Sequence, residues 1–158
     1  MKVLKHHLST ALKETFAGKP WYGDALMEKL NSLNHQVVNL IPQGLSYSIA
    51  KQIKHVISWR NFVIEKLNGN VDYNIEINSA IDWPDVQINS DSDWKELLEE
   101  LVASQKELLD LLSDKSDAFL ESQVPNHEYN FHFLIEGIIQ HDVYHQGQIA
   151  VIASLLKS

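Results

Sequence analysis

Apolar residues recur every three or four positions through most of the chain, which is the spacing of amphipathic helices. Four such segments stand out, covering approximately residues 3–33, 46–67, 90–119 and 129–155. Four helices with one long connection in the middle are typical of a four-helix bundle. We therefore expect an all-α fold of this kind, with a less regular α-helical domain as the alternative.

Local signals place the ends of these helices. Residues 18–20, Gly-Lys-Pro, interrupt the first segment because proline removes a backbone donor and clashes with the preceding turn. Ser46 or Ser48 can cap the second helix, and Asn-Gly-Asn at 68–70 ends it. The third helix is expected to run unbroken from its cap to about Phe119.

Residues 71–90 lack the helical period and form a crossover between the second and third helices. A short alternation at 73–77 resembles a strand, but the chain offers no partner strand for it. We expect the crossover to be ordered by Ile81, Trp83 and Val86, which would pack on the helices.

Composition narrows the class of protein. The chain has 158 residues, enough for one domain spanning 1–158, and its formal net charge is -8. That charge argues against binding to nucleic acids and to anionic membrane surfaces. The chain has no cysteine, so a metal would be held by nitrogen and oxygen. It also shows no signal peptide and no apolar run of membrane-spanning length, so we expect a cytoplasmic protein.

The most informative stretch is QHDVYHQGQIAVI, residues 140–152. On a helix His141 and His145 lie one turn apart on one face, close enough to chelate one cation. Leu134, Ile138 and Ile152 share that face, so the two imidazoles interrupt a core-facing row. Two interpretations are open: a metal ion compensates the cost of burying them, or they hydrogen-bond to buried carboxylates or carbonyl groups.

His55 is the candidate for a third ligand. It lies midway along the second helix, on a face shared with Gln52 and Trp59. Three imidazoles leave a coordination position open for water or substrate, as in catalytic zinc sites. Imidazole ligands suit Zn, Ni, Cu or Fe.

Four neighbours of the histidine pair are candidates for the surroundings of the site. Gly147 costs about 1 kcal/mol in a helix, which a close approach of another helix or of a ligand would explain. Gln148 could donate to a metal-bound water. Asp142 could orient an imidazole from another helix, and Tyr144 could be core or place its hydroxyl near the site.

The remaining polar residues near these motifs have a simpler interpretation. We expect an ordinary surface or hydrogen-bonding role for the other five histidines and a solvated position for the cations of the second helix. These are His6, His7, His35, His127 and His132, and Lys51, Lys54 and Arg60.

The two histidine segments, GIIQHDVYHQGQIAVI and SYSIAKQIKHVISWRNFVIEKLNG, resemble the last-helix and second-helix signatures of the DinB-like, or YfiT-like, superfamily. KPWYGDALMEKL and IDWP are similar to the elements between them, so the resemblance covers nearly the whole chain. It implies an up-down-down-up bundle with a divalent metal, Zn, Ni or Fe, on His55, His141 and His145. It also implies small-molecule substrates, use of a low-molecular-weight thiol by some members, and often a homodimer.

Three hypotheses follow. The first is a metal-dependent enzyme, either a thiol-dependent S-transferase, as the resemblance implies, or a hydrolase. The second is a non-catalytic module that uses the same metal to bind a small ligand. The third is a structural bundle whose histidines are only hydrogen-bonded.

Overall fold

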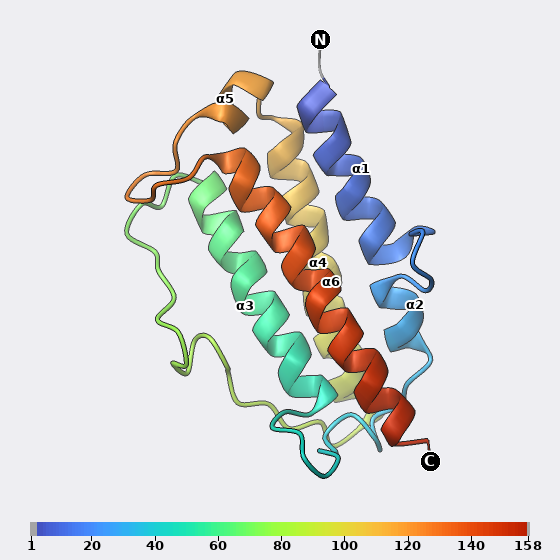
Figure 1. The fold of residues 1–158 in the computed structure, drawn as a ribbon. Helices are drawn as coiled ribbons and strands as arrows, with labels where there is room; N and C mark the ends of the chain where they lie inside the picture. The colour runs from blue at the N-terminus through green and yellow to red at the C-terminus, as the bar shows by residue number, and fades with distance from the viewer. Residues whose placement is uncertain (1–2, 158) are drawn as a thin grey trace.

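Four long helices run alongside one another in the computed structural model, which describes residues 3–157 (Figure 1). The elements are α1 (Val3–Ala17), α2 (Leu26–Asn31), α3 (Ile49–Leu67), α4 (Asp91–Ser113), α5 (Asp117–Glu121) and α6 (Phe131–Leu155). The described part of the chain contains no strand, and none of its helices is long and apolar enough to cross a membrane. The all-α fold is confirmed.

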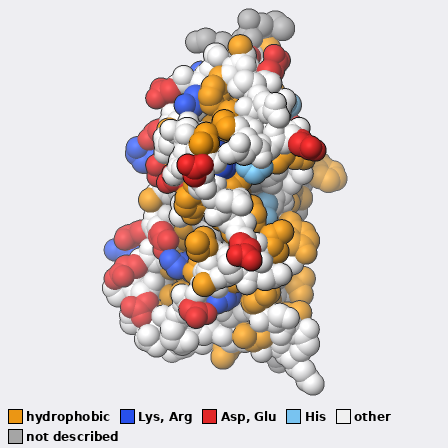
Figure 2. All heavy atoms as spheres, turned by 90° about the vertical axis from the view of Figure 1, so that its left-hand side faces the viewer, with side chains coloured by type: hydrophobic (Ala, Val, Ile, Leu, Met, Phe, Trp, Pro, Cys, Tyr) orange, Lys and Arg blue, Asp and Glu red, His pale blue; other side chains and the backbone are white. Residues whose placement is uncertain are grey.

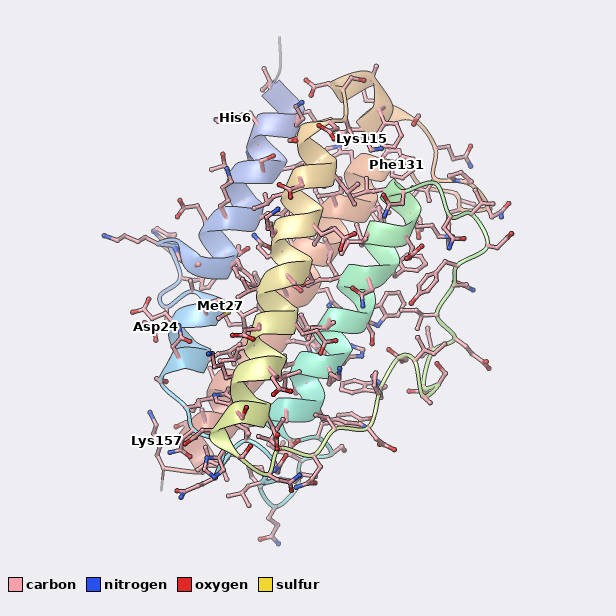
Figure 3. The ribbon with its side chains drawn as sticks, turned by 180° about the vertical axis from the view of Figure 1, so that it is seen from behind. His6, Asp24, Met27, Lys115, Phe131 and Lys157 are labelled. Carbon is pink, nitrogen blue, oxygen red and sulfur yellow. The ribbon has the colours of Figure 1, made fainter. Side chains whose placement is uncertain are left out.

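The helices have the up-down-down-up order that the resemblance implied. α3 and α4 run in one direction, joined by the long crossover, whereas α1 and α6 run in the other (Figure 1). Seen from behind, Lys115 just after α4 lies near Phe131 at the start of α6, and Lys157 lies at the opposite end (Figure 3). α3 contacts α4 and α6, and α1 contacts the same two helices, so α1 and α3 occupy opposite corners.

Capping residues explain where the helices begin. The side chains of Ser48, Ser90 and Asn130 accept hydrogen bonds from the backbone N–H three residues later, at the starts of α3, α4 and α6. Ser48 rather than Ser46 is therefore the cap of the second long helix. Asn68 ends that helix, as expected.

The expectation of an unbroken third helix to Phe119 is wrong. α4 ends at Ser113, and a separate short helix, α5, starts after Ser116, whose hydroxyl accepts from the N–H of Phe119. Serine and aspartate compete with the helical backbone for its hydrogen bonds, and the sequence Ser-Asp-Lys-Ser-Asp at 113–117 favours such a break.

The residues that anchor the crossover are those expected at two of three positions. Ile81 is exposed, whereas Ile75 and Ile88 are buried in the core. Trp83 and Val86 do pack inward, Trp83 against a histidine ring and Val86 against the apolar core. An aperiodic segment gives no rule for which apolar side chain turns inward, and this explains the error at Ile81.

A buried polar layer divides the core into two apolar halves. At its centre is Arg60 of α3, which is 1% exposed, so the expectation that it is solvated is wrong. Its Nε and Nη2 donate to Asp142 Oδ2 of α6 at 3.0 and 2.6 Å, and Nη1 donates to Gln105 Oε1 of α4 at 3.0 Å. Its guanidinium carbon lies 4.8 Å from the ring centre of Phe16 of α1. One side chain of α3 therefore contacts the other three long helices.

Removing Asp142 should destabilise the fold strongly. In Asp142→Ala the guanidinium of Arg60 stays buried without its counter-charge, which typically costs about 3–5 kcal/mol. Urea unfolding in the presence of a chelator would measure the free energy of unfolding. The double variant Arg60→Met/Asp142→Leu, which buries no charge, should be more stable than Asp142→Ala.

An exposed ion pair provides the control for this measurement. Asp110→Ala removes a pair with Lys106 on the solvent side of α4, and the free energy of unfolding should hardly change. Equal losses in Asp110→Ala and Asp142→Ala would contradict the central role of the buried pair.

Candidate metal centre

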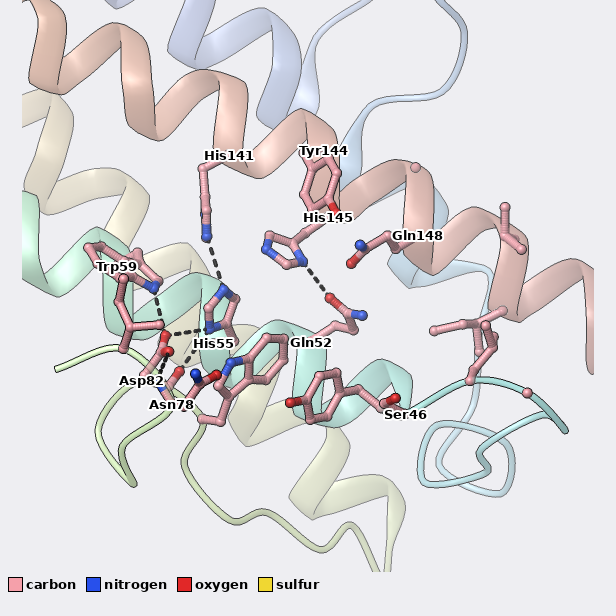
Figure 4. Close-up of a pocket in the computed structure, with 18 residues that line it drawn as sticks. Ser46, Gln52, His55, Trp59, Asn78, Asp82, His141, Tyr144, His145 and Gln148 are labelled. Carbon is pink, nitrogen blue, oxygen red and sulfur yellow. Dashed lines mark hydrogen bonds and ion pairs between the residues drawn. The ribbon is translucent and has the colours of Figure 1, made fainter. Parts of the chain in front are cut away.

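Three histidines from two helices face one another between α3 and α6 (Figure 4). His55 comes from α3, and His141 and His145 come from successive turns of α6. One nitrogen from each ring lies within 4.8 Å of one from each of the others. His55 Nε2 and His141 Nε2 are 3.1 Å apart. Two ligands of a tetrahedral zinc ion, with Zn–N bonds of about 2.0–2.1 Å, would be separated by about 3.3 Å.

Hydrogen bonds fix which nitrogen of two of the rings is free. His55 Nδ1 lies 2.8 Å from the main-chain carbonyl oxygen of Asp82, which can only accept, so Nδ1 carries the proton. His145 Nδ1 likewise donates to Gln52 Oε1 at 2.5 Å. The Nε2 lone pair of each ring is then available, which is the arrangement found in metal-binding histidines.

Burial favours the neutral form of His55 and of His145. It lowers the pKa of His145 to about 3, and repulsion by His141 and His55 adds to the effect. Burial also lowers the pKa of His55, against the opposing hydrogen bond to the Asp82 carbonyl. Neutral imidazole is the form that binds a metal, so the donor set fits a divalent ion.

Asp82 of the crossover contacts two α3 side chains of the site, His55 and Trp59. This role was not predicted from the sequence. Its carboxylate is 2% exposed, and Oδ1 accepts from Trp59 Nε1 at 2.8 Å and lies 3.0 Å from His55 Nδ1. Oδ2 accepts from the backbone N–H of Asn78 at 2.7 Å. Asn78 has φ 65°, a left-handed conformation that asparagine tolerates better than most residues.

A stack of three rings forms one wall of the site. The ring of Trp83 lies 3.7 Å from that of His55 and 3.9 Å from that of Tyr47, with interplanar angles of 9° in both cases. Sequence reasoning placed Trp83 against the helices without connecting it to a histidine, and did not consider Tyr47. The motif IDWP at 81–84 was the available signal for this wall.

Of the other residues predicted to surround the histidine pair, one belongs to the buried polar layer and two lie at the pocket. Asp142 pairs with Arg60 rather than with an imidazole from another helix, and its Oδ1 lies 4.0 Å from His141 Nδ1. Tyr144 is 64% exposed at the rim, so it is not core. Gln148 lines the site, and its buried Oε1 has no hydrogen-bond partner among the described residues.

A pocket of about 870 Å³, here called the main pocket, opens onto the three histidines. Gln52, Trp59 and Gly147 also line it. A Cβ atom at Gly147 would meet nothing within 4 Å, so this glycine keeps pocket space free and does not admit a neighbouring helix. The histidines can therefore be reached by a small molecule.

The remaining polar residues lie away from the centre. The expected solvated lysines of α3, Lys51 and Lys54, pair with Asp85 and Glu100. His35 pairs with Asp91, and His132 with Glu136. His6 lies exposed on the outer side of α1 (Figure 3).

Comparison with known proteins gives one match. The family model for the DinB superfamily matches residues 23–149, a span that includes α2 to α5, most of α6 and all three histidines. Searches of curated proteins and of solved structures gave no match.

Acid should destabilise the metal-free protein through these histidines. The folded-state pKa of His145, about 3, lies below its ordinary value of 6.5. The unfolded chain therefore binds the proton first, and stability present above pH 6.5 is lost as the pH falls toward 3. The loss should reach up to about 1.4 kcal/mol per pH unit for this histidine. Urea unfolding at several pH values, with chelator present, would measure it.

His145→Gln removes this titrating group and should flatten the dependence of unfolding free energy on pH. The matched control is His132→Gln, which changes a surface histidine of the same helix and should keep the wild-type slope. An unchanged slope in His145→Gln would contradict the burial argument.

Proposed function

This chain belongs to the DinB superfamily, and from that premise we propose that it is a metal-dependent enzyme acting on a small-molecule substrate. His55, His141 and His145 would be the protein ligands of a divalent ion, with Zn, Ni and Fe as the candidates. The observation that carries the proposal is the set of three facing imidazoles, of which His55 and His145 are buried and have their Nε2 lone pairs freed by hydrogen bonds at Nδ1.

An open coordination side supports catalysis rather than a purely structural site. Three imidazoles without a fourth protein ligand are typical of catalytic zinc centres, and here they face the main pocket. A divalent ion at this place would supply a Lewis acid and lower the pKa of a bound water or thiol. Trp83 and Tyr47 would shield one side of the reacting groups from water.

Two nucleophiles are compatible with this site. The resemblance to characterised superfamily members favours a low-molecular-weight thiol, and hence S-transfer. The described residues that line the main pocket include no lysine and no arginine, which favours water or an uncharged thiol over an anionic one such as glutathione. Hydrolysis is therefore the second candidate.

A non-catalytic module would use the same ligands and the same pocket. Metal-dependent turnover separates the two functions: an enzyme converts activated electrophiles with water, 2-mercaptoethanol or glutathione as nucleophile, whereas a binding module only retains them. Turnover that persists after the metal is removed would contradict the proposed role of the ion.

Metal content is the direct test of the site. Wild-type protein purified without a polyhistidine tag should contain about one equivalent of divalent metal by elemental mass spectrometry, given one three-histidine site. His145→Ala should lose it, and His132→Ala should retain it. No metal in the wild type, even after incubation with Zn, Ni and Fe, would eliminate the proposal.

The carboxylate of Asp82 should strengthen metal binding without touching the ion. Groups that orient a ligating histidine typically contribute a factor of about 10–100 in affinity, so Asp82→Ala should weaken zinc binding by at least about tenfold. Competition with a chromophoric chelator would measure the affinity. Asp85→Ala is the matched control, because Asp85 belongs to the same crossover but is fully exposed and pairs with Lys51. Equal affinities in the two variants would show that the carboxylate of Asp82 does not orient His55.

A further inference from the structure

A second, smaller cavity lies beside the histidines, between α3 and α6. Its volume is about 200 Å³, and we call it the side cavity. Its lining is almost wholly apolar, with Phe62 and Val63 from α3 and Leu134 and Ile138 from α6. For comparison, a dry apolar cavity of about 150 Å³ can hold a benzene molecule.

The side cavity and the main pocket at the candidate metal centre share two lining residues. Trp59 and His141 line both the side cavity and the main pocket. The two spaces are therefore adjacent, and a ligand whose reacting group sits at the three histidines would reach the apolar space by extending past His141. Histidine atoms are visible at the surface among hydrophobic side chains when the crossover side faces the viewer (Figure 2).

The two glycines of α6 lie in the linings of the two cavities. Gly137 lines the side cavity and Gly147 the main pocket, and a Cβ atom at either would meet nothing within 4 Å. Each costs about 1 kcal/mol of helix propensity relative to alanine. Close helix packing does not explain this cost at either position, whereas free space for a ligand does.

The segments that enclose these cavities carry no free cation. α6, the loop 40–48 and the crossover 71–90 contain neither lysine nor arginine. The four cations of α3 are all engaged: Lys51 with Asp85, Lys54 with Glu100, Arg60 with Asp142, and Lys66 with the carbonyl oxygen of Val71. The ammonium group of Lys66 lies 5.4 Å from the ring centre of Phe62, but Lys66 is buried and donates to main-chain carbonyl groups. Apart from this group, a ligand with a negatively charged tail would find no counter-charge here.

We propose that the side cavity binds an uncharged aromatic arm of the substrate, so that the substrate class is a neutral aromatic compound with one group directed at the three histidines. Its place beside a metal centre rests on the proposed function, whereas the binding of a ring by the cavity itself does not.

Three probes with the same metal-binding group test the proposal on the zinc-loaded full chain. Acetohydroxamic acid carries the group alone, benzohydroxamic acid adds an uncharged ring, and 4-carboxybenzohydroxamic acid adds a charged one. By titration calorimetry the uncharged ring should improve affinity at least tenfold, and the carboxylate should abolish most of that gain. Equal affinities of all three probes would overturn the proposal.

Variants of lining residues test whether the ring of the probe binds in the side cavity. Gly137→Leu fills the side cavity while favouring the helix, and should abolish the gain from the ring without changing the affinity for acetohydroxamic acid. Phe133 and Tyr144 form a matched pair on α6, 61% and 64% exposed, lining the side cavity and the main pocket respectively. Phe133→Ala should reduce the gain, and Tyr144→Ala should preserve it. The reverse pattern would place the ring in the main pocket and overturn the proposal.

A metal-free readout separates the two proposals. Benzyl alcohol should shift the amide signal of Gly137 and the indole signal of Trp59 in an NMR titration of the metal-free protein, and should not do so in Gly137→Leu. If these shifts occur but acetohydroxamic acid fails to bind the zinc-treated chain, the metal centre is wrong and the aromatic site stands. If acetohydroxamic acid binds and the shifts are absent, the aromatic site is wrong and the metal centre stands.

Discussion

The buried pair of Arg60 and Asp142 is the interaction on which the rest of the bundle depends. Two charges removed from water are tolerated only when their geometry is good and their remaining hydrogen-bonding groups are satisfied. The guanidinium meets this requirement through Asp142 and Gln105, and Gln105 also donates to the carbonyl oxygen of Leu12. The carboxylate meets it through Oδ2 alone, because Asp142 Oδ1 has no hydrogen-bond partner among the described residues. These bonds hold the long helices in the register that brings His55 of α3 opposite His141 of α6.

Periodicity predicted the long helices well, because each buries an apolar stripe. It could not predict the polar layer. A lone arginine on a helix wheel has the same pattern whether it snorkels to solvent or meets a carboxylate 82 residues away. The break between α4 and α5 was missed for a similar reason: the leucines of α4 continue in phase up to the serine and aspartate residues that end it.

The three facing histidines could be predicted from helical spacing and from resemblance, since both depend on residues of regular helices. The approach of Tyr47, Trp83 and Asp82 to the histidines could not be derived from periodicity, because these residues come from irregular segments for which no period fixes the direction of a side chain. Which residues such segments contact far along the chain can be seen only in the folded structure. Here these contacts determine which nitrogen of His55 faces the pocket.

The main-chain carbonyl of Asp82 has a consequence for how this site can diverge. A side-chain acceptor is lost by a single substitution, but a carbonyl oxygen is present whatever residue occupies position 82. The proton on His55 Nδ1 is therefore controlled by the path of the crossover rather than by its sequence. Substitutions that keep this path can therefore change the pocket wall without moving the proton from His55 Nδ1.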